Sequence, residues 1–252
     1  MTGRAPESPR SRGEQAPPLL AWAGHRPPVA VEPPWTPTYR AVASRFPPVS
    51  LFDQVADADE LEVVFALQDL TNPRVRQEIG QISLVPPLER VAGPGSTPVM
   101  AAFTHLNRAG SRFSDGTWGV YYAAESVATA AAEVSFHSAR FLQQTRQPAI
   151  EIDYRVYVAR VQKRLHDVRS RRWDLVHDPD DYSASVGFAR HCRSAGSWGL
   201  IYRSVRRLKG ECVALFRPRA LELPVIQGAH IALRWNGSAI DGWFYKSDHH
   251  PL

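Results

Sequence analysis

The sequence predicts an α+β fold, with a largely antiparallel sheet as its core and helices flanking it. Short stretches rich in alternating, β-branched or aromatic residues recur between residues 117 and 245 and are typical of strands. Helical patterns lie among them without the regular strand–helix–strand order of a doubly wound sheet. The stretch RVAGPGSTPV contains Pro94 and lacks the third glycine of a dinucleotide-binding fingerprint, so a Rossmann domain is rejected.

The chain has 252 residues, which is enough for one domain of moderate size with tails. Eleven of its 21 prolines fall within residues 1–48. We therefore expect a flexible, proline-rich arm over 1–36, one domain over 37–246 and a C-terminal tail over 247–252. Trp22 and Trp35 leave open that the arm docks on the domain.

Composition indicates a soluble, cytoplasmic and moderately basic protein. No run of about 18 apolar residues exists, so no membrane span is expected, and the N-terminus has no continuous apolar region of a secretory signal. Cys192 and Cys212 are too few for a disulfide framework and are expected to be free thiols. The net charge of +5 comes mainly from arginine, which binds phosphate bidentately; it suits nucleic acid, a phosphorylated small molecule or an acidic protein.

Each element follows from a local signal. DADELEVVFALQDLTN predicts a helix over about 58–70, ended by the proline that follows, and RVAGPGSTPV is expected to be a loop. TWGVYYAA, residues 117–124, is a short strand after an Asp-Gly turn. Ser126 then caps a helix that runs to about Gln143.

The second half of the chain is richer in strands. AIEIDYRVYVARV alternates, which predicts a half-buried strand whose outer face carries Glu151, Asp153 and Arg155. DPDDYSASVGFARHCRSAG predicts a helix that begins at acidic residues and ends at Gly196. WGLIYRS, ECVALFRP, HIALRWNG and AIDGWFYK are expected to be further short strands.

The helix after Ser126 carries a candidate catalytic carboxylate. Val127, Ala130, Val134 and Phe141 form an apolar stripe at helical spacing, and Glu133 lies at its flank because each residue advances by about 100°. The small neighbours of Glu133 would leave space above it, which suits a carboxylate that lines a cleft against the sheet. A solvent-exposed glutamate is the alternative.

Four other residues are ambiguous when each is taken alone. Arg112 could be a solvated turn residue, Tyr122 a half-buried core residue, and Ser204 an ordinary turn serine. Arg40 cannot be interpreted by itself. Glu133 and His137 stand four residues apart, but no HExxH motif and no third ligand accompany them, so no metal is expected. The acidic residues Asp178, Asp180 and Asp181 fit a helix N-terminus better than a calcium loop.

Taken in order, these motifs resemble the RES-domain toxins of bacterial Xre–RES toxin–antitoxin pairs. The resemblance rests on Tyr39-Arg40, on SRFSDG, and on VYYAAESVATAAAE, which fits the family spacing Y-x-A-x4-T-A-x2-E up to Glu133. GLIYRSVRRLKGECVALFRP and LRWNGSAIDGW continue it, so that it covers roughly Tyr39 to Trp243. Asn236 stands where the family commonly has aspartate.

The resemblance implies a fold like that of the ADP-ribosyltransferases and the diphtheria-toxin group. It also implies NAD as the substrate, with no further cofactor and no metal, and depletion of cytosolic NAD as the toxic act. The residues that match the family's functional positions are Glu133, Arg112 and Tyr122 as catalytic residues, and Arg40, Arg112, Tyr122 and Ser204 as NAD-binding residues. The implied partner is a cognate Xre-type antitoxin that blocks the pocket and carries the DNA-binding role; a homodimer within the complex is compatible with it.

The chemistry of NAD is compatible with one carboxylate. Nicotinamide is cationic in NAD and leaves as a neutral molecule, so it needs no general acid, unlike the leaving group of ordinary glycosidases. One carboxylate can stabilise the oxocarbenium-like ribose, and an aromatic face can hold the nicotinamide ring. Water, inorganic phosphate or a protein side chain could accept the ADP-ribose; NAD breakdown is preferred and protein ADP-ribosylation is the close alternative.

A nucleic-acid-binding protein or ribonuclease remains a second alternative. Two basic clusters could form such a footprint, one over 203–209 and one over 163–172. The aromatic–basic interleaving of RNA-binding proteins is absent, and contact with DNA is expected only through the antitoxin. An inactive, antitoxin-binding relative of the family is a third alternative.

Overall fold

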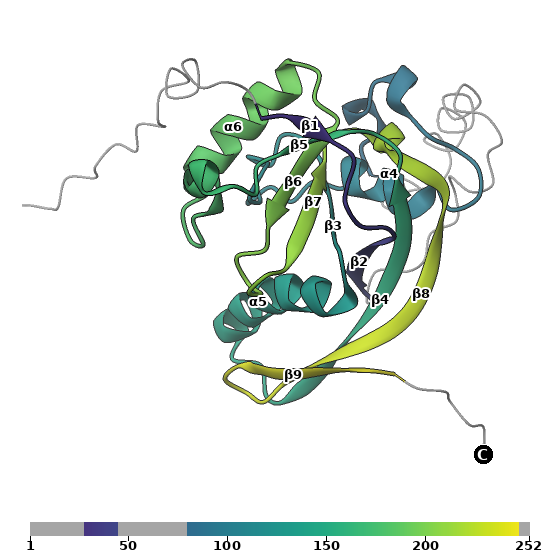
Figure 1. The fold of residues 1–252 in the computed structure, drawn as a ribbon. Helices are drawn as coiled ribbons and strands as arrows, with labels where there is room; N and C mark the ends of the chain where they lie inside the picture. Colours follow the sequence, from purple (N-terminus) through teal and green to yellow (C-terminus); the bar gives the residue numbers. More distant parts are fainter. Residues whose placement is uncertain (1–27, 45–79, 247–252) are drawn as a thin grey trace, which may run out of the picture.

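The protein forms one nine-stranded sheet, in the order β1-β5-β6-β7-β3-β2-β4-β8-β9 (Figure 1). The computed structural model describes residues 28–44 and 80–246. Every strand pair is antiparallel except β5 with β6, so the expected α+β fold with a largely antiparallel core is confirmed. The strands are β1 (Ala30–Val31), β2 (Thr38–Ala43), β3 (Tyr121–Ala124), β4 (Ile150–Val161), β5 (Leu165–Asp167), β6 (Gly199–Arg203), β7 (Glu211–Leu215), β8 (Leu221–Trp235) and β9 (Ile240–Tyr245).

Helices cover the sheet and connect its strands. Short 3-10 segments accompany the longer helices. The described helical elements are η2 (Ile82–Leu84), η3 (Pro87–Glu89), α4 (Thr97–Thr104), α5 (Val127–Thr145), η4 (Arg171–His177), α6 (Ser183–Ser194) and η5 (Pro218–Ala220). The expected helices after Ser126 and before Gly196 are confirmed as α5 and α6. The helix expected over 58–70 and the tail over 247–252 lie outside the described residues.

The sheet opens between β2 and β3. These strands share a single residue pair, Tyr39 with Ala124, whereas β2 pairs with β4 along its whole length from Thr38 to Ala43. β3 in turn pairs with β7 over Tyr121–Ala124. Each of the two strands is therefore held by its outer neighbour, and the space between them can be occupied by something other than backbone hydrogen bonds.

The two faces of the opened sheet carry different helices. Val99, Met100 and Phe103 of α4 share an apolar cluster with Tyr121 and Val213. On the other face Ala131 of α5 packs with Tyr154, Val156, Ile231 and Leu233, which belong to β4 and β8. Apolar side chains at every second position of these strands explain why each face buries its own cluster.

The alternation of β4 predicted the burial of one face of the strand correctly, but not that of the other. Tyr154 and Val156 are buried against α5, as predicted, while Ile150 at the strand start is 44% exposed. Arg155 was expected on a solvated face, and this is wrong: Arg155 is only 5% exposed. The middle of β4 is covered on both sides, because the α4 side of the sheet encloses a cavity there.

Helix α5 begins where the sequence predicts. The Ser126 side chain accepts a hydrogen bond from the Thr129 amide, so it satisfies an N–H that has no partner within the helix. Ala130 is buried and Val134 packs against the cluster under α5, but Phe141, which was expected in the same apolar stripe, is 52% exposed. The helix ends at Thr145, two residues beyond the expected end.

Helix α4 is a feature that the sequence analysis missed. The loop predicted for RVAGPGSTPV is confirmed over residues 90–96, but its last three residues begin the helix. Pro98 occupies the first turn, where a missing N–H costs nothing. Gly119 explains how closely α4 approaches the sheet. A Cβ at this position would lie 2.3 Å from the Phe103 Cα, so only glycine permits this contact.

Part of the expected N-terminal arm belongs to the sheet. β1 pairs with β5, and the Trp35 indole N–H donates to Glu211 Oε2 at 2.8 Å. Residues 28–36, which the sequence assigned to the flexible arm, are therefore folded on the domain. Residues 1–27 lie outside the described part.

Candidate active site

A cavity of about 910 Å³ occupies the opening between β2 and β3. Its walls come from β2 and β4, from α4 and α5, and from residues 105–124, which lead into and form β3. Four of the five candidate residues line it: Arg40, Arg112, Tyr122 and Glu133. The fifth, Ser204, is joined to the cavity through Glu133. The structure thus brings together residues from four separate segments of the chain: β2, residues 105–124, α5 and the turn after β6.

Charge in the cavity is unevenly distributed. Among the described lining residues Glu133 is the single acid, while three arginines, Arg40, Arg112 and Arg155, line the same space. A lone carboxylate among several guanidinium groups makes the cavity attractive to anions and leaves one point where positive charge can be stabilised.

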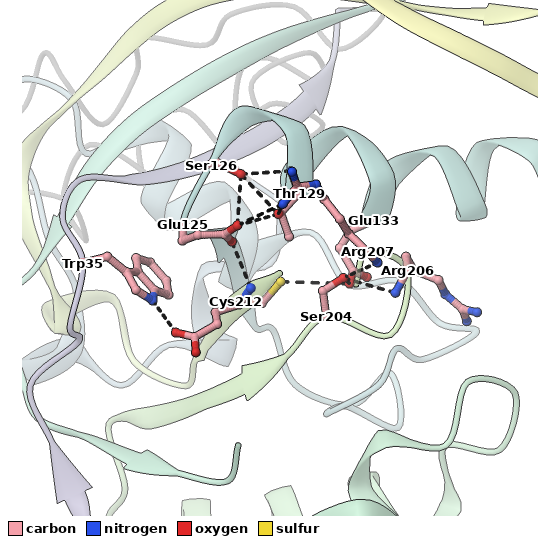
Figure 2. Close-up of polar contacts among 10 residues, drawn as sticks. Trp35, Glu125, Ser126, Thr129, Glu133, Ser204, Arg206, Arg207 and Cys212 are labelled. Carbon is pink, nitrogen blue, oxygen red and sulfur yellow. Dashed lines mark hydrogen bonds and ion pairs between the residues drawn. The ribbon is translucent and has the colours of Figure 1, made fainter. Parts of the chain in front are cut away.

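Glu133 is anchored by Ser204 (Figure 2). Ser204 Oγ donates a hydrogen bond of 2.6 Å to Glu133 Oε1. The same oxygen accepts from the amides of Arg206 and Arg207, at 3.1 and 2.9 Å. The hydroxyl therefore uses its proton and both lone pairs, so it fixes one carboxylate oxygen and leaves Oε2 for other partners.

The turn that carries Ser204 depends on a close contact with α5. Ser204 N donates to the Gly210 carbonyl, and Lys209 adopts the left-handed conformation at φ 62°. A Cβ on Gly210 would lie 2.9 Å from two side-chain atoms of Thr129 and 3.1 Å from Ser204 Cβ. Only glycine lets the turn sit against α5 closely enough for Ser204 to reach Glu133.

A second polar network holds the start of α5 to β7. Glu125 Oε1 accepts a hydrogen bond of 2.6 Å from Thr129 Oγ1, and Glu125 Oε2 accepts one of 3.0 Å from the Glu211 amide. Arg207 reaches both Glu125, at 3.6 Å, and Thr129 Oγ1, at 3.3 Å. These contacts, drawn in Figure 2, fix the spacing between α5 and the turn after β6.

Arg112 is buried and only partly satisfied. Its Nη1 donates to the carbonyls of Val176 and Asp178, at 3.3 and 2.6 Å, and its guanidinium lies 4.6 Å from the centre of the Tyr182 ring. Its Nη2 is buried and has no hydrogen-bond partner in the described chain. No carboxylate pairs with Arg112 within the described residues, so its charge is available to a ligand.

Arg40 is in a similar state. Its Nη1 donates to the Tyr122 carbonyl at 3.2 Å, across the opening from β2 to β3, and its guanidinium lies 4.7 Å from the centre of the Tyr121 ring. Its Nε is buried without a partner, and no acid of the described part pairs with it. Burial lowers the pKa of Arg40, because the cation has lost its hydration without gaining a counter-ion.

The Tyr122 phenol is held in one orientation. Its oxygen lies 2.8 Å from Ser111 Oγ and accepts a hydrogen bond of 2.9 Å from the Phe113 amide. Burial raises the pKa of Tyr122 to about 12, despite these hydrogen bonds, so the phenol is neutral at physiological pH. Tyr122 thus offers an uncharged, oriented aromatic ring to the cavity that Glu133 also lines.

Comparison with known proteins assigns the chain to a family. The model of the RES domain family matches residues 87–236, more than half of the chain, including Arg112, Tyr122, Glu133 and Ser204. The chain belongs to the RES domain family. Arg40 lies outside the matched span, yet it lines the same cavity.

Two further similarities accompany the family match. An uncharacterized protein of Sinorhizobium fredii, y4oC, is 30% identical to this RES protein over 207 residues, covering 80% of this chain and 84% of that protein. A chain in the crystal structure of the M. tuberculosis MbcT–MbcA toxin–antitoxin complex shares 12% identity, with a TM-score of 0.44, over 83% of this chain and 88% of that one.

Sequence analysis missed several residues of the RES-domain cavity. Arg155 was placed on an outer face by strand alternation, and nothing in its local sequence indicated a cavity on the α4 side. His137 was considered only as a metal ligand; it lines the cavity, and burial followed by Arg206, Arg140 and Arg112 lowers its pKa. Cys212 Sγ lies 4.0 Å from Glu133, and burial, then the negative charge of Glu133, raises the pKa of this thiol well above its ordinary value.

The basic clusters of the RES domain are largely committed to internal contacts. In the turn after β6, Arg203 pairs with Asp174, Arg207 with Glu125, and Arg206 lies 3.3 Å from the centre of the Phe136 ring. In the second cluster Arg169 binds both Asp167 and Glu211. These contacts give the clusters a structural role and weaken the nucleic-acid alternative.

The described residues also give information on metal binding, on the two cysteines, on the acidic residues before α6 and on membrane-spanning helices. No group of three metal-ligand side chains is found among residues 28–44 and 80–246. Cys192 and Cys212 are free and buried. The acidic residues before α6 order the turns that lead into the helix: Asp178 Oδ1 accepts from the amides of Asp180 and Asp181, and Asp181 accepts from the amide of Ser183, the first helical residue. Within the same ranges, no helix combines the length and hydropathy needed to cross a bilayer.

Proposed function

We propose that this RES protein is the toxin of a toxin–antitoxin pair and that it cleaves the nicotinamide–ribose bond of NAD. The observation that carries the proposal is the composition of one cavity. It contains a single anchored carboxylate, Glu133, together with two arginines, Arg40 and Arg112, each of which has a buried nitrogen without a hydrogen-bond partner and no carboxylate partner in the described chain.

The two arginines favour a diphosphate as ligand. A buried guanidinium without a counter-ion is costly, since its lost hydration is not replaced by an ion pair. Arg40 and Arg112 each keep a buried nitrogen without a partner, and arginine is well suited to bidentate contact with phosphate oxygens. The diphosphate of a dinucleotide would supply the missing anion between the two nucleoside halves.

A single carboxylate is sufficient for the bond that breaks. The C–N bond electrons go to the nicotinamide ring nitrogen, which is cationic in NAD and leaves neutral, so no side chain donates a proton. Positive charge then develops on the ribose, and Glu133 Oε2 is free to stabilise it or to bind the ribose hydroxyls. Glycosidases require a second carboxylate, and the described cavity lining has none.

Tyr122 and Ser204 take supporting roles in this proposal. The neutral Tyr122 ring holds the cationic nicotinamide by stacking, a contact worth about 0.5–2 kcal/mol. Ser204 positions Glu133, because its hydroxyl is already bonded to the carboxylate and to two amides. Contact between Ser204 and NAD remains a prediction, and it would require one of these bonds to be exchanged.

The acceptor of the ADP-ribose group defines the finer activity. Water gives hydrolysis and inorganic phosphate gives phosphorolysis; either depletes cellular NAD, and modification of a protein side chain is the alternative. The family resemblance supports a cytoplasmic toxin that is neutralised by a cognate Xre-type antitoxin covering the cavity. Such a partner would explain how a cell tolerates an enzyme that consumes its NAD.

The test is release of nicotinamide from NAD by the purified full-length protein, with the ribose product identified by mass in the presence and absence of phosphate. Glu133→Gln should abolish release, because it removes the charge with almost no change of shape. Glu151→Gln, at an exposed position of β4, is the matched control and should remain active. Full turnover by Glu133→Gln, or no turnover by the wild type, would refute the proposal.

A further inference from the structure

The cavity extends well beyond Glu133. The part of it that faces α4, on the opposite face of the sheet from α5, has no assigned ligand. We infer that the α4 side of the cavity binds the adenosine half of the dinucleotide, so that NAD passes through the opening of the sheet. This inference rests on the proposed function for the identity of the ligand. Its carrying observations are the strand registers, the composition of the α4 wall and the position of Arg40.

The strand registers divide the cavity into two sides. Side chains alternate along a strand, and residues paired across strands point to the same face. Arg40 pairs with Tyr157 and Val42 with Arg155, so these four side chains share one face of the sheet. Tyr39 belongs to the opposite face, together with Ala41, Tyr122 and Ala124, by the pairing of Tyr39 with Ala124.

Each side has its own chemistry. Glu133 projects from α5, which packs on the face that carries Tyr39 and Ala41. Tyr157 instead packs against the apolar cluster that contains α4. The reaction centre therefore lies on the α5 side, and the described residues that line the α4 side include no acid.

The α4 wall is shaped for a flat, uncharged group. Thr97, Pro98, Ala101 and Ala102 occupy one helical face and line the cavity, and their side chains are all small. Across the same side, Tyr157 supplies an aromatic ring from β4. Apolar walls with an aromatic face are the usual environment for a nucleobase, which binds largely by stacking.

Polar groups border this slot without filling it. His105 and Asn107, at the end of α4 and just after it, also line the cavity. Asn107 is held by the Gly110 carbonyl and the Ala109 amide, and it retains a second amide proton that it can donate to a base or a ribose. Arg155 adds a cation to the same face as Arg40. The slot can therefore recognise a nucleoside without requiring a second carboxylate.

Arg40 connects the two sides in the order that the ligand requires. It starts on the α4 face of β2, and its Nη1 donates to the backbone carbonyl of Tyr122, the residue whose side chain lies on the α5 face. Its buried, unpaired Nε therefore lies between the slot and the reaction centre. In NAD the diphosphate likewise lies between adenosine and the nicotinamide ribose. The diphosphate would therefore lie next to the Arg40 guanidinium.

The direct test uses 5′-AMP as the probe, with binding measured by calorimetry on the full-length protein. The wild type should bind AMP, and AMP should compete with NAD. Ala101→Trp should fill the slot and weaken AMP binding by at least about tenfold, the loss expected when stacking of a base is prevented. Leu88→Trp adds the same ring at a position that is 84% exposed and outside the cavity, and it should bind AMP normally.

Two further variants keep the outcome decisive. Ala101→Leu adds less volume and should give an intermediate loss if Ala101→Trp fails to fold. Glu151→Gln, which removes a carboxylate at an exposed position outside the cavity, should bind AMP like the wild type. Unchanged AMP affinity in both Ala101 variants, or no AMP binding by the wild type, would overturn the inference.

Turnover separates this inference from the proposed function. Nicotinamide mononucleotide lacks the adenosine half, so Ala101→Trp should lower kcat/KM for NAD by at least about tenfold and leave release of nicotinamide from the mononucleotide unchanged. AMP binding that is sensitive to Ala101, without any nicotinamide release, would support the slot and refute the proposed activity. NAD turnover that is insensitive to Ala101 would support the activity and refute the slot.

Discussion

Ser204 donates a 2.6 Å hydrogen bond to Glu133, and this bond joins the turn after β6 to helix α5 across 71 residues of sequence. Because the Ser204 oxygen also accepts from two backbone amides, the carboxylate is tied to a rigid part of the fold. The proposed catalytic group is therefore held before any substrate arrives, as electrostatic stabilisation of a transition state requires.

Ser204→Ala should lower kcat for NAD by about 10- to 100-fold with little change in KM, since it releases a preorganised group without removing a binding contact. It also leaves two turn amides without their acceptor, which should cost about 1–2 kcal/mol of unfolding free energy. Steady-state kinetics at a temperature where the variant is folded checks both parameters. A raised KM with normal kcat would show instead that Ser204 binds the substrate.

Arg40→Met should raise KM for NAD by at least about tenfold, because the contact with the proposed diphosphate is lost. It should cost no more than about 1 kcal/mol of unfolding free energy in the free protein, because the variant loses a single carbonyl hydrogen bond, to Tyr122, while removing a cation that has no counter-ion. Thermal unfolding with and without ADP-ribose measures both effects. The proposal for Arg40 is contradicted if ADP-ribose stabilises the variant as much as the wild type.

Arg112→Met provides the contrast to Arg40. Arg112 also donates to the carbonyls of Val176 and Asp178, which hold the segment between η4 and α6. Its loss should therefore weaken NAD binding and also destabilise the protein, by about 1–3 kcal/mol. Equal stability of the two arginine variants would show that these carbonyl contacts contribute little.

Gly210→Ala should destabilise the protein and lower activity, because its Cβ would lie 2.9 Å from Thr129 and push the Ser204 turn away from α5. The matched control is Gly187→Ala inside α6, where nothing lies within 4 Å, and this change should stabilise the protein by about 0.5–1 kcal/mol. Denaturant unfolding and NAD turnover test the pair. Adding Thr129→Ala to Gly210→Ala should recover part of the activity, and a lack of recovery would argue against the steric cause.

Stability should fall as the pH is lowered below 6.5. Burial holds the pKa of His177 below its usual value of 6.5, so the unfolded state takes up a proton more readily than the folded state. With Nδ1 bonded to the Trp173 carbonyl, Nε2 accepts from the Arg203 amide, one residue before Ser204, and protonation removes this acceptor. The contribution of His177 is thus present above pH 6.5 and lost as the pH falls through its folded pKa.

Denaturant unfolding between pH 5 and 8 measures this effect. His177→Gln should show a smaller loss of unfolding free energy over the same range, because glutamine does not titrate. Parallel pH profiles of the variant and the wild type would assign the acid sensitivity to other groups; His137 and His166 also have lowered pKa values through burial.

Local patterns predicted most of the secondary structure. Ser126 marked the start of α5, and the alternation around Tyr154 marked β4, because capping and pleating act between near neighbours. Helix α4 was missed because the proline and glycines around it are also the residues of loops. The sequence could place Glu133 beside a cleft, but its bond to Ser204 joins segments that no local rule relates.

The opening of the sheet could not be predicted from the sequence for the same reason. Six residues of β2 look like an ordinary strand, and nothing in them shows that only Tyr39 meets β3. Arg155 therefore had the pattern of a solvated residue, although it lies beside a cavity. Arg40, Arg112 and Tyr122 were connected by the family resemblance rather than by any periodicity.

The long sequence separation between the carboxylate and its serine anchor has a consequence for the newly made chain. A nascent polypeptide that has emerged only as far as α6 already contains Glu133 and all three cavity arginines, but it lacks the turn that immobilises the acid. We expect such fragments to leave NAD intact. Cleavage of NAD would then begin only after β7 has been synthesised. A neutralising partner would therefore have time to bind the protein while its synthesis is being completed.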